Sequence, residues 1–128
     1  MPIRTPEHLH AARRLVLEWS TRLEFSSLER TKLVTAASEL GRNALVHGLG
    51  GGMTISELRK DARVGLQLVF EDSGPGIGNI EQAMSDGYSS ARSMGLGLGG
   101  ARRLVNEFDI ASGPGQGTRV TVRQWKRR

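Results

Sequence analysis

Apolar residues recur at every second position over residues 64–71, and this alternation predicts a β-strand. One face of the strand carries Leu66, Leu68 and Phe70, and we expect that face to be fully buried and the opposite face to be partly covered. The run ends abruptly at Asp72. The pattern therefore predicts a strand that places a carboxylate at the end of a sheet.

A tight glycine loop is expected directly after this strand. Gly74 and Gly76 follow Asp72, and glycine permits backbone dihedrals closed to other residues and lets a flat ligand approach the main chain. The alternative interpretation is a plain turn in which the Asp72 carboxylate caps its own loop. This motif alone leaves both interpretations open.

Two stretches near the amino terminus show the three- and four-residue spacing of amphipathic helices. The first covers residues 6–23. The second begins with the capping-box pair Ser26 and Glu29 and runs to about His47, where Gly48 favours a left-handed helix end. We expect both helices to pack on the sheet through their apolar stripes.

Polar side chains recur at four-residue intervals on the second helix, at Glu39, Asn43 and His47, so they line one narrow face. An acid and an amide one turn apart can hold a carboxylate and a metal-ligating oxygen over one small volume. An ordinary solvated face with an internal hydrogen bond is the alternative. We assign His47 no role beyond packing or support through a hydrogen bond.

The remaining elements follow from turn residues and alternation. We expect strands over residues 53–58, 108–112 and 117–125, a flexible turn at 50–52, a polar hairpin connection at 59–63, a short amphipathic segment at 80–84 and a helix over 100–107. The order predicts an α+β fold, a two-layer sandwich of helices on one mixed or antiparallel sheet.

Glycines at alternate positions precede the last of these helices, at Gly95, Gly97 and Gly99. Unpaired N–H groups and the positive end of the helix dipole make such a helix start a natural phosphate cradle. The lysine of a Walker loop is missing, and the spacing of a dinucleotide loop is missing too. A flexible loop is the alternative interpretation.

Composition narrows the functional classes. With 128 residues, of which 38% are apolar, the chain is expected to be a single domain over residues 1–128. It has no cysteine, so disulfides and thiolate metal sites are excluded. No leader and no membrane span is expected, and we predict a cytoplasmic protein. The net charge of +5 comes mainly from the carboxyl-terminal residues 123–128, which favours a solvated tail, or a face for an acidic partner, over nucleic-acid binding.

Three motifs follow one another along the chain and are spread over most of its length: Glu39-x-x-x-Asn43, Asp72-x-Gly74-x-Gly76 and Gly95-Leu-Gly-Leu-Gly99. Together they resemble the N, G1 and G2 boxes of the GHKL (Bergerat-fold) ATPases, over about residues 5–125. The sequences Glu-Leu-Gly-Arg-Asn and Asp-Gly-Tyr-Ser look most like the RsbT branch, serine/threonine protein kinases related to the anti-sigma-factor kinases RsbW and SpoIIAB.

The resemblance implies ATP and Mg²⁺ as cofactors and assigns roles to the matching residues. Asn43 matches the magnesium ligand, Glu39 the acid that activates the attacking hydroxyl, and Asp72 the carboxylate that binds the adenine amino group. The other matches are Gly74 and Gly76 for close packing under the ring, Thr118 for support of the adenine contact, and Gly95, Leu96, Gly97, Leu98 and Gly99 for the phosphate-wrapping lid. Arg42 and Arg92 could each meet a phosphate or the partner, and a solvated arginine is the preferred interpretation of either.

The resemblance also implies a substrate. The leading hypothesis is a serine/threonine protein kinase that phosphorylates a STAS-domain partner (RsbS- or RsbR-like) in stressosome signalling and then activates a PP2C-type, RsbU-like phosphatase. The alternatives are an anti-sigma-factor kinase that binds a sigma factor and a non-catalytic nucleotide-sensing adaptor. No nucleic-acid or membrane partner is expected, and pairing of two copies is left open.

The sequence departs from the family at its amino terminus. These kinases usually have an edge strand before the first helix, but here only about residues 1–5 could form it. The sequence therefore leaves open whether a strand covers this edge of the sheet.

Overall fold

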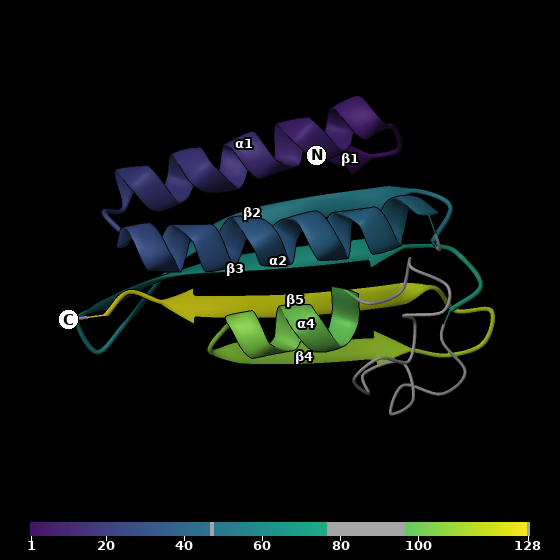
Figure 1. Ribbon diagram of the computed structural model, residues 1–128. Helices are drawn as coiled ribbons and strands as arrows, with labels where there is room; N and C mark the ends of the chain where they lie inside the picture. The colour runs from purple at the N-terminus through teal and green to yellow at the C-terminus, as the bar shows by residue number, and fades with distance from the viewer. Residues whose placement is uncertain (47, 77–96, 128) are drawn as a thin grey trace.

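The structure, a computed structural model, describes residues 1–46, 48–76 and 97–127. Helices cover one face of a five-stranded sheet whose strand order is β1-β2-β3-β5-β4 (Figure 1). The elements are β1 (Pro2–Ile3), α1 (Pro6–Arg22), α2 (Ser27–Val46), β2 (Gly51–Lys60), β3 (Arg63–Asp72), α4 (Gly97–Leu104), β4 (Glu107–Ser112) and β5 (Thr118–Trp125). All neighbouring strands pair antiparallel, so the predicted α+β class is confirmed and the described sheet is antiparallel, not mixed.

The first two helices both begin with side-chain caps, and the sequence predicted the second of them. Thr5 caps α1 because its hydroxyl accepts a hydrogen bond from the N–H of His8 at 3.1 Å. Ser26 and Glu29 form a reciprocal capping box: the Ser26 N–H donates to Glu29 Oε1 at 2.8 Å, and the Glu29 N–H donates to Ser26 Oγ at 3.1 Å. These caps fix where α1 and α2 start.

The core lies between α2 and the central strands. Leu66, Leu68 and Phe70 of β3 are buried, which confirms the predicted inner face, and Val69 on the other face is buried too. Neighbouring core residues come from α2 and β5: Leu33, Ala36, Ala37, Leu40, Val120 and Val122. β3 therefore has more buried residues than any other described strand.

Two turn predictions around β2 are wrong. Gly51 and Gly52, expected in a flexible turn, belong to β2 and pair with Asp72 and Glu71. A side chain at Gly51 would overlap the Glu71 carbonyl, so glycine serves there for close strand packing and not for flexibility. The predicted connection at 59–63 shrinks to Asp61 and Ala62, whose φ values of 52° and 64° suit a two-residue hairpin turn.

The last helix lies earlier in the chain than predicted. α4 spans Gly97–Leu104, whereas the sequence suggested residues 100–107. Leu98 and Ala101, three residues apart, both enter the core and draw the preceding turn into the helix. Glu107 instead begins β4. The segment predicted at 80–84 lies outside the described residues.

The edge strand forms, but it is short. β1 pairs only with Gly51 and Gly52 of β2. Within the described residues, no helix is long and apolar enough to cross a membrane.

Candidate functional site

Asp72 stands at the end of the central strand, between Gly51 of β2 and Thr118 of β5. Its Oδ1 accepts a hydrogen bond from the Gly74 N–H at 3.0 Å, which is the side-chain cap considered as the plain alternative for this loop. Burial raises the pKa of the Asp72 carboxyl above its usual value, although the N–H groups of Gly74 and Thr118 act in the opposite direction. The site thus holds a partly desolvated acid.

The end of α2 packs directly on this carboxyl. A Cβ atom at Gly48 would overlap the Asp72 carboxyl group, and one at Gly74 would lie 2.7 Å from the Gly48 Cα. Gly48 is therefore needed for this close contact. The left-handed backbone conformation after α2 occurs at the next two residues, Leu49 with a φ of 60° and Gly50 with a φ of 100°. Backbone N–H groups of Gly48 and Gly50 satisfy two carbonyls of the last helical turn.

The β4–β5 hairpin closes the other side of Asp72. A side chain at Gly117 would overlap the Asp72 carbonyl, and a side chain at Gly76, whose φ is 79°, would overlap the Gly113 carbonyl. Thr118 lies opposite Asp72 in the strand register, and its hydroxyl is 2.9 Å from the Ser112 hydroxyl. The two residues predicted to share the adenine contact are thus neighbours.

Glu39 and Asn43 lie one turn apart on α2, before the segment that reaches Asp72. Glu39 Oε1 is 3.5 Å from Arg42 Nη1, and its side chain is 30% exposed. The Asn43 Nδ2 atom is buried and has no hydrogen-bond partner among the described residues. A buried amide without a partner is costly, which favours a site where a ligand supplies the missing contact. His47, which shares their predicted face, lies outside the described residues.

The predicted phosphate lid is only partly described. Gly95 and Leu96 lie outside the described residues, whereas Gly97, Leu98 and Gly99 form the first turn of α4. Leu98 is 6% exposed and packs in the core, so its side chain anchors the helix here. Among the described residues, no group of three or more His, Asp or Glu side chains could hold a metal ion.

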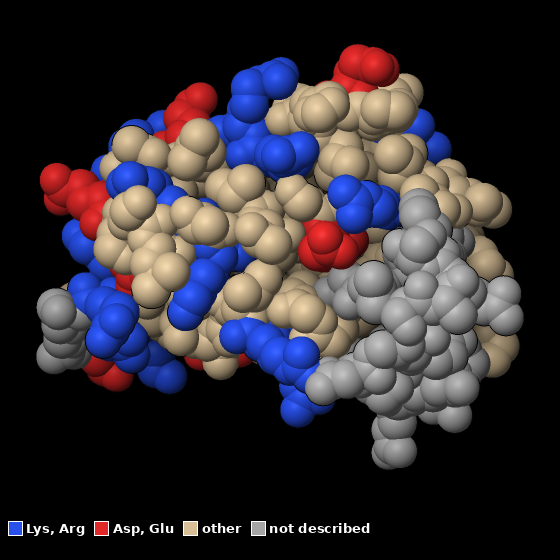
Figure 2. All heavy atoms as spheres, in the orientation of Figure 1, with Lys and Arg blue, Asp and Glu red and all other residues tan. Residues whose placement is uncertain are grey.

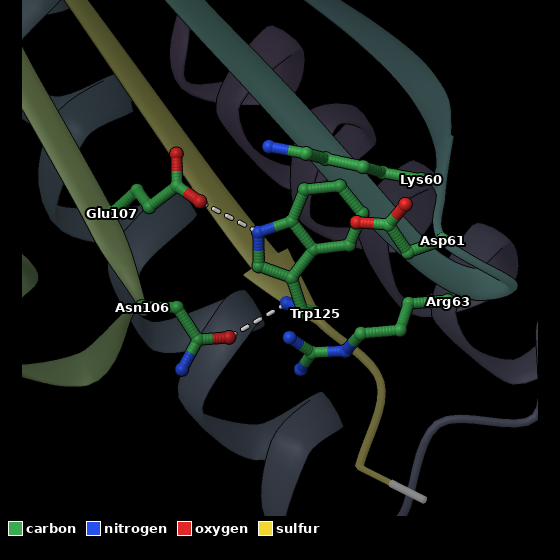
Figure 3. Close-up of a pocket in the computed structure, with 6 residues that line it drawn as sticks. All are labelled: Lys60, Asp61, Arg63, Asn106, Glu107 and Trp125. Carbon is green, nitrogen blue, oxygen red and sulfur yellow. Dashed lines mark hydrogen bonds between the residues drawn. The ribbon is translucent and has the colours of Figure 1, made fainter.

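A hollow of about 420 Å³ lies at the opposite end of β3 (Figure 3). It is lined by Lys60, Asp61, Arg63, Asn106, Glu107 and Trp125. β3 has ten residues, so about 30 Å separates this hollow from Asp72. We interpret this region as structural, because the side chains that line the hollow are hydrogen-bonded to one another, and we call the contacts around it the Trp125 joint.

Trp125 is the centre of this joint. Its Nε1–H donates to Glu107 Oε2 at 2.7 Å, and its backbone N–H donates to Asn106 Oδ1 at 2.6 Å (Figure 3). The Arg63 guanidinium lies 5.6 Å from the centre of the indole ring, within the range of a cation–π interaction. Sequence reasoning missed this joint, although a glycine inside a strand, Gly65, marks a close approach.

Arg127 in the carboxyl-terminal tail is exposed, as expected, but its backbone is held to α2. The Arg127 N–H donates to Glu29 Oε2 at 2.8 Å, and Arg123 bonds to Gln67 and Glu107. Elsewhere, Lys and Arg side chains are spread over the helical face (Figure 2). They include Arg42 and Arg102, which lie on α2 and α4.

Known proteins are similar in sequence to this chain over nearly its whole length. The profile of a family described as a histidine kinase-like ATPase domain matches residues 4–124. The serine/threonine-protein kinase RsbT of Bacillus subtilis is 35% identical over 125 residues, which cover 98% of this chain and 94% of that protein. An anti-sigma F factor of Clostridium acetobutylicum is 29% identical over 119 residues, with 88% and 82% covered, and one of Clostridium novyi is 28% identical with the same coverage.

Proposed function

The chain belongs to the histidine kinase-like ATPase domain family, and from this premise we propose that it is an ATP-dependent serine/threonine protein kinase of the RsbT kind. One observation carries the proposal: the end of α2, the Asp72 carboxyl and Thr118 meet at one end of the sheet. The proposal places the enzyme in the cytoplasm, which the absence of cysteine favours.

The nucleotide base would bind beside Asp72. An ionised carboxylate accepts a hydrogen bond from an exocyclic amino group, and the Thr118 hydroxyl on the next strand is near enough to assist. Partial burial supports this role, since a desolvated carboxylate gains more from a donor than a fully hydrated one does. Gly74 and Gly76 would keep this wall free of side chains.

The phosphates and the metal would lie along the polar face of α2. Mg²⁺ takes oxygen ligands and is commonly held by one or two protein groups together with substrate phosphates, so one amide can suffice. Asn43 would offer its Oδ1 atom to the metal, whereas its buried Nδ2, a donor without a partner among the described residues, would donate to a phosphate oxygen. We assign Gly95, Leu96, Gly97 and Gly99 to the lid over the phosphates, as the family pattern implies, while Leu98, whose side chain packs in the core, would hold the end of the lid in place.

Glu39 would act as the base that takes the proton from the attacking seryl or threonyl hydroxyl. Its side chain is partly exposed, so a protein substrate can reach it. The Arg42 guanidinium lies beside it, with Nη1 3.5 Å from Glu39 Oε1.

The proposed substrate is a STAS-domain protein. Phosphorylation of that protein would release the kinase, and the free kinase would then activate a PP2C-type phosphatase. Support comes from the similarity to RsbT over nearly the whole of both chains. The test measures transfer of labelled γ-phosphate from ATP to a STAS-domain protein in the presence of Mg²⁺. We expect transfer by the unmodified chain and none by Glu39→Ala at equal ATP affinity.

Two outcomes would contradict this assignment. If Glu39→Ala transferred phosphate as well as the unmodified chain, Glu39 would not be the base. If nucleotide bound but no STAS-domain protein were phosphorylated, the chain would be a nucleotide-sensing adaptor.

Similarity to anti-sigma F factors favours a second candidate, a kinase that also binds a sigma factor. A pull-down with immobilised chain and Mg-ATP separates the two. Capture of sigma subunits supports the second candidate, whereas capture of STAS-domain proteins alone supports the first.

A further inference from the structure

Leu49 has an unfavourable backbone conformation shortly after the end of α2. Its φ is 60°, in the left-handed region where a residue other than glycine has its side chain too close to its own backbone. Hydrogen bonds on both sides hold it there, because the N–H groups of the flanking glycines bond to carbonyls of the last turn of α2 at 3.0 and 2.7 Å. A glycine at position 49 would relieve this strain.

Packing of the Leu49 side chain does not offset the strain. It is 78% exposed, which makes it the most exposed large apolar side chain that the structure describes. Val46, three residues earlier, is 40% exposed, and we call Val46 and Leu49 the apolar anchor. A single exposed leucine is ordinary. A leucine that is both strained and exposed is typical of a residue that contacts a ligand or a partner.

The apolar anchor follows the polar side of α2. Glu39, Arg42 and Val46 recur at intervals of three and four residues, so they share one side of the helix. The side chains of Glu39 and Arg42 are 30% and 44% exposed. Val46 lies seven residues after Glu39, about 10 Å along the helix axis. A protein bound at Glu39 is large enough to cover the anchor as well, since each side of a standard interface buries about 800 Å².

Two arginines lie next to the apolar anchor. Arg42 precedes Val46 by about one helical turn. Arg4 approaches from the connection between β1 and α1: a Cβ atom at Gly50 would lie 3.5 Å from its Cγ and 3.7 Å from its Nη1. Arginine is enriched in protein interfaces, and its guanidinium group binds carboxylates. This arrangement fits a partner surface that carries an apolar side chain beside acidic residues.

A protein fits this surface better than a nucleic acid or the nucleotide does. The Glu39 carboxylate on the same side of α2 would repel a phosphate backbone. The groups assigned to the nucleotide, the Asp72 carboxyl and Asn43 Nδ2, are partly or fully buried, whereas the apolar anchor is exposed.

We propose that the apolar anchor, with Arg4 and Arg42 beside it, is the docking surface for the protein that this enzyme phosphorylates, an inference that rests on the proposed kinase function. The partner presents an apolar side chain about 10 Å from its acceptor hydroxyl, with carboxylates next to that side chain. Leu49 makes its apolar contacts in the complex and not in the free chain.

Two substitutions at Leu49 separate docking from strain. Leu49→Ala should weaken the binding of a STAS-domain protein about tenfold. Leu49→Gly should weaken it as much and also raise Tm by about 4 °C, because glycine relieves the strain. Mg-ATP affinity should change in neither variant. Leu28→Ala is the matched control, since Leu28 is an exposed leucine at the opposite end of α2 and its truncation should leave both affinities unchanged.

A charge reversal tests the acidic character of the partner surface. Arg4→Glu should weaken the binding of the STAS-domain protein about tenfold and reduce the dependence of that binding on salt. Arg119→Glu makes the same change at an exposed residue of β5 and should have neither effect. Calorimetric titration at two salt concentrations measures both.

The outcomes distinguish this inference from the proposed function. If the unmodified chain phosphorylated the STAS-domain protein, but Leu49→Ala and Arg4→Glu bound it as tightly, the docking surface would be wrong and the kinase function would stand. A loss of Mg-ATP affinity in Leu49→Ala would assign the anchor to the nucleotide instead. If the unmodified chain bound Mg-ATP but no STAS-domain protein, both proposals would fail.

Discussion

The two ends of strand β3 differ in how they are held. At Asp72, glycines make the contacts: Gly48 packs against the Asp72 carboxyl group, and Gly74 and Gly117 pack against neighbouring backbone, so a side chain at any of the three would overlap. At Arg63, side chains make the contacts, because Trp125 covers the strand and bonds to Asn106 and Glu107.

The difference separates function from anchorage. At the Trp125 end, hydrogen bonds between protein groups hold the last strand in place. At the Asp72 end, burial works against the ionised carboxyl, and the nearby Asn43 amide has a donor without a partner among the described residues. Polar groups that lack hydrogen-bond partners within the protein are available to a ligand. Substitutions at the Asp72 end should therefore alter ATP affinity, and substitutions at the Trp125 end should alter the free energy of unfolding.

The largest effect is expected from Asp72→Asn. It removes the acceptor charge for the adenine amino group, so ATP affinity should fall about a hundredfold or more. The folded-state pKa of Asp72 is raised, so its contribution to stability is present below the unfolded pKa and is lost as pH rises through the folded pKa. The neutral amide should therefore leave the free protein equally or more stable at pH 7.

Calorimetric titration with Mg-ATP and urea unfolding measure these two quantities on the same sample. A variant that lost both ATP affinity and stability would show that Asp72 serves the fold, and the contrast between the two ends would fail.

Gly48→Ala should have the next largest effect. The new methyl group would overlap the Asp72 carboxyl, so we expect a loss of about 2 kcal/mol of stability and a weaker ATP affinity. Gly100→Ala is the matched control: nothing lies within 4 Å of its Cβ position in α4, so it should be neutral or stabilise by up to about 1 kcal/mol. Equal effects of the two variants in thermal unfolding would contradict the close packing at Gly48.

Glu29→Gln should lower stability without changing ATP affinity. Burial alone would raise the pKa of Glu29, but hydrogen bonds from Ser26 and Arg127 outweigh it and hold that pKa below its usual value of 4.5. Its stabilisation is thus present above the unfolded pKa and is lost as pH falls through the folded pKa. We expect a deficit of about 1–2 kcal/mol at pH 7.

The pH dependence is the check on this interpretation. Urea unfolding of the unmodified chain and of Glu29→Gln, at pH 7 and at about pH 3, should show that the stability difference between them becomes smaller in acid. A deficit that stayed constant would mean that shape and not charge matters at Glu29.

Sequence reasoning predicted the inner face of β3, both amino-terminal helices and the capping box, because each depends on neighbours close in the chain. It was wrong about Gly51, since a glycine that packs against a strand looks the same in sequence as one in a turn. It also missed Trp125, whose partners lie 18 or more positions away. The contact of Asp72 with Gly48 likewise joins residues far apart in the chain, so only the family resemblance suggested that the end of α2 and the end of β3 meet there.

The smallest effect is expected from Trp125→Phe. The change keeps an aromatic ring over Gly65 but removes the Nε1–H that bonds to Glu107, so stability should fall by about 1 kcal/mol. ATP affinity should stay unchanged, because the ring lies about 30 Å from Asp72 along β3. Urea unfolding and nucleotide titration of the same variant check both statements. A loss of ATP affinity here would mean that the two ends of β3 are coupled, and the separation of anchorage from binding would have to be abandoned.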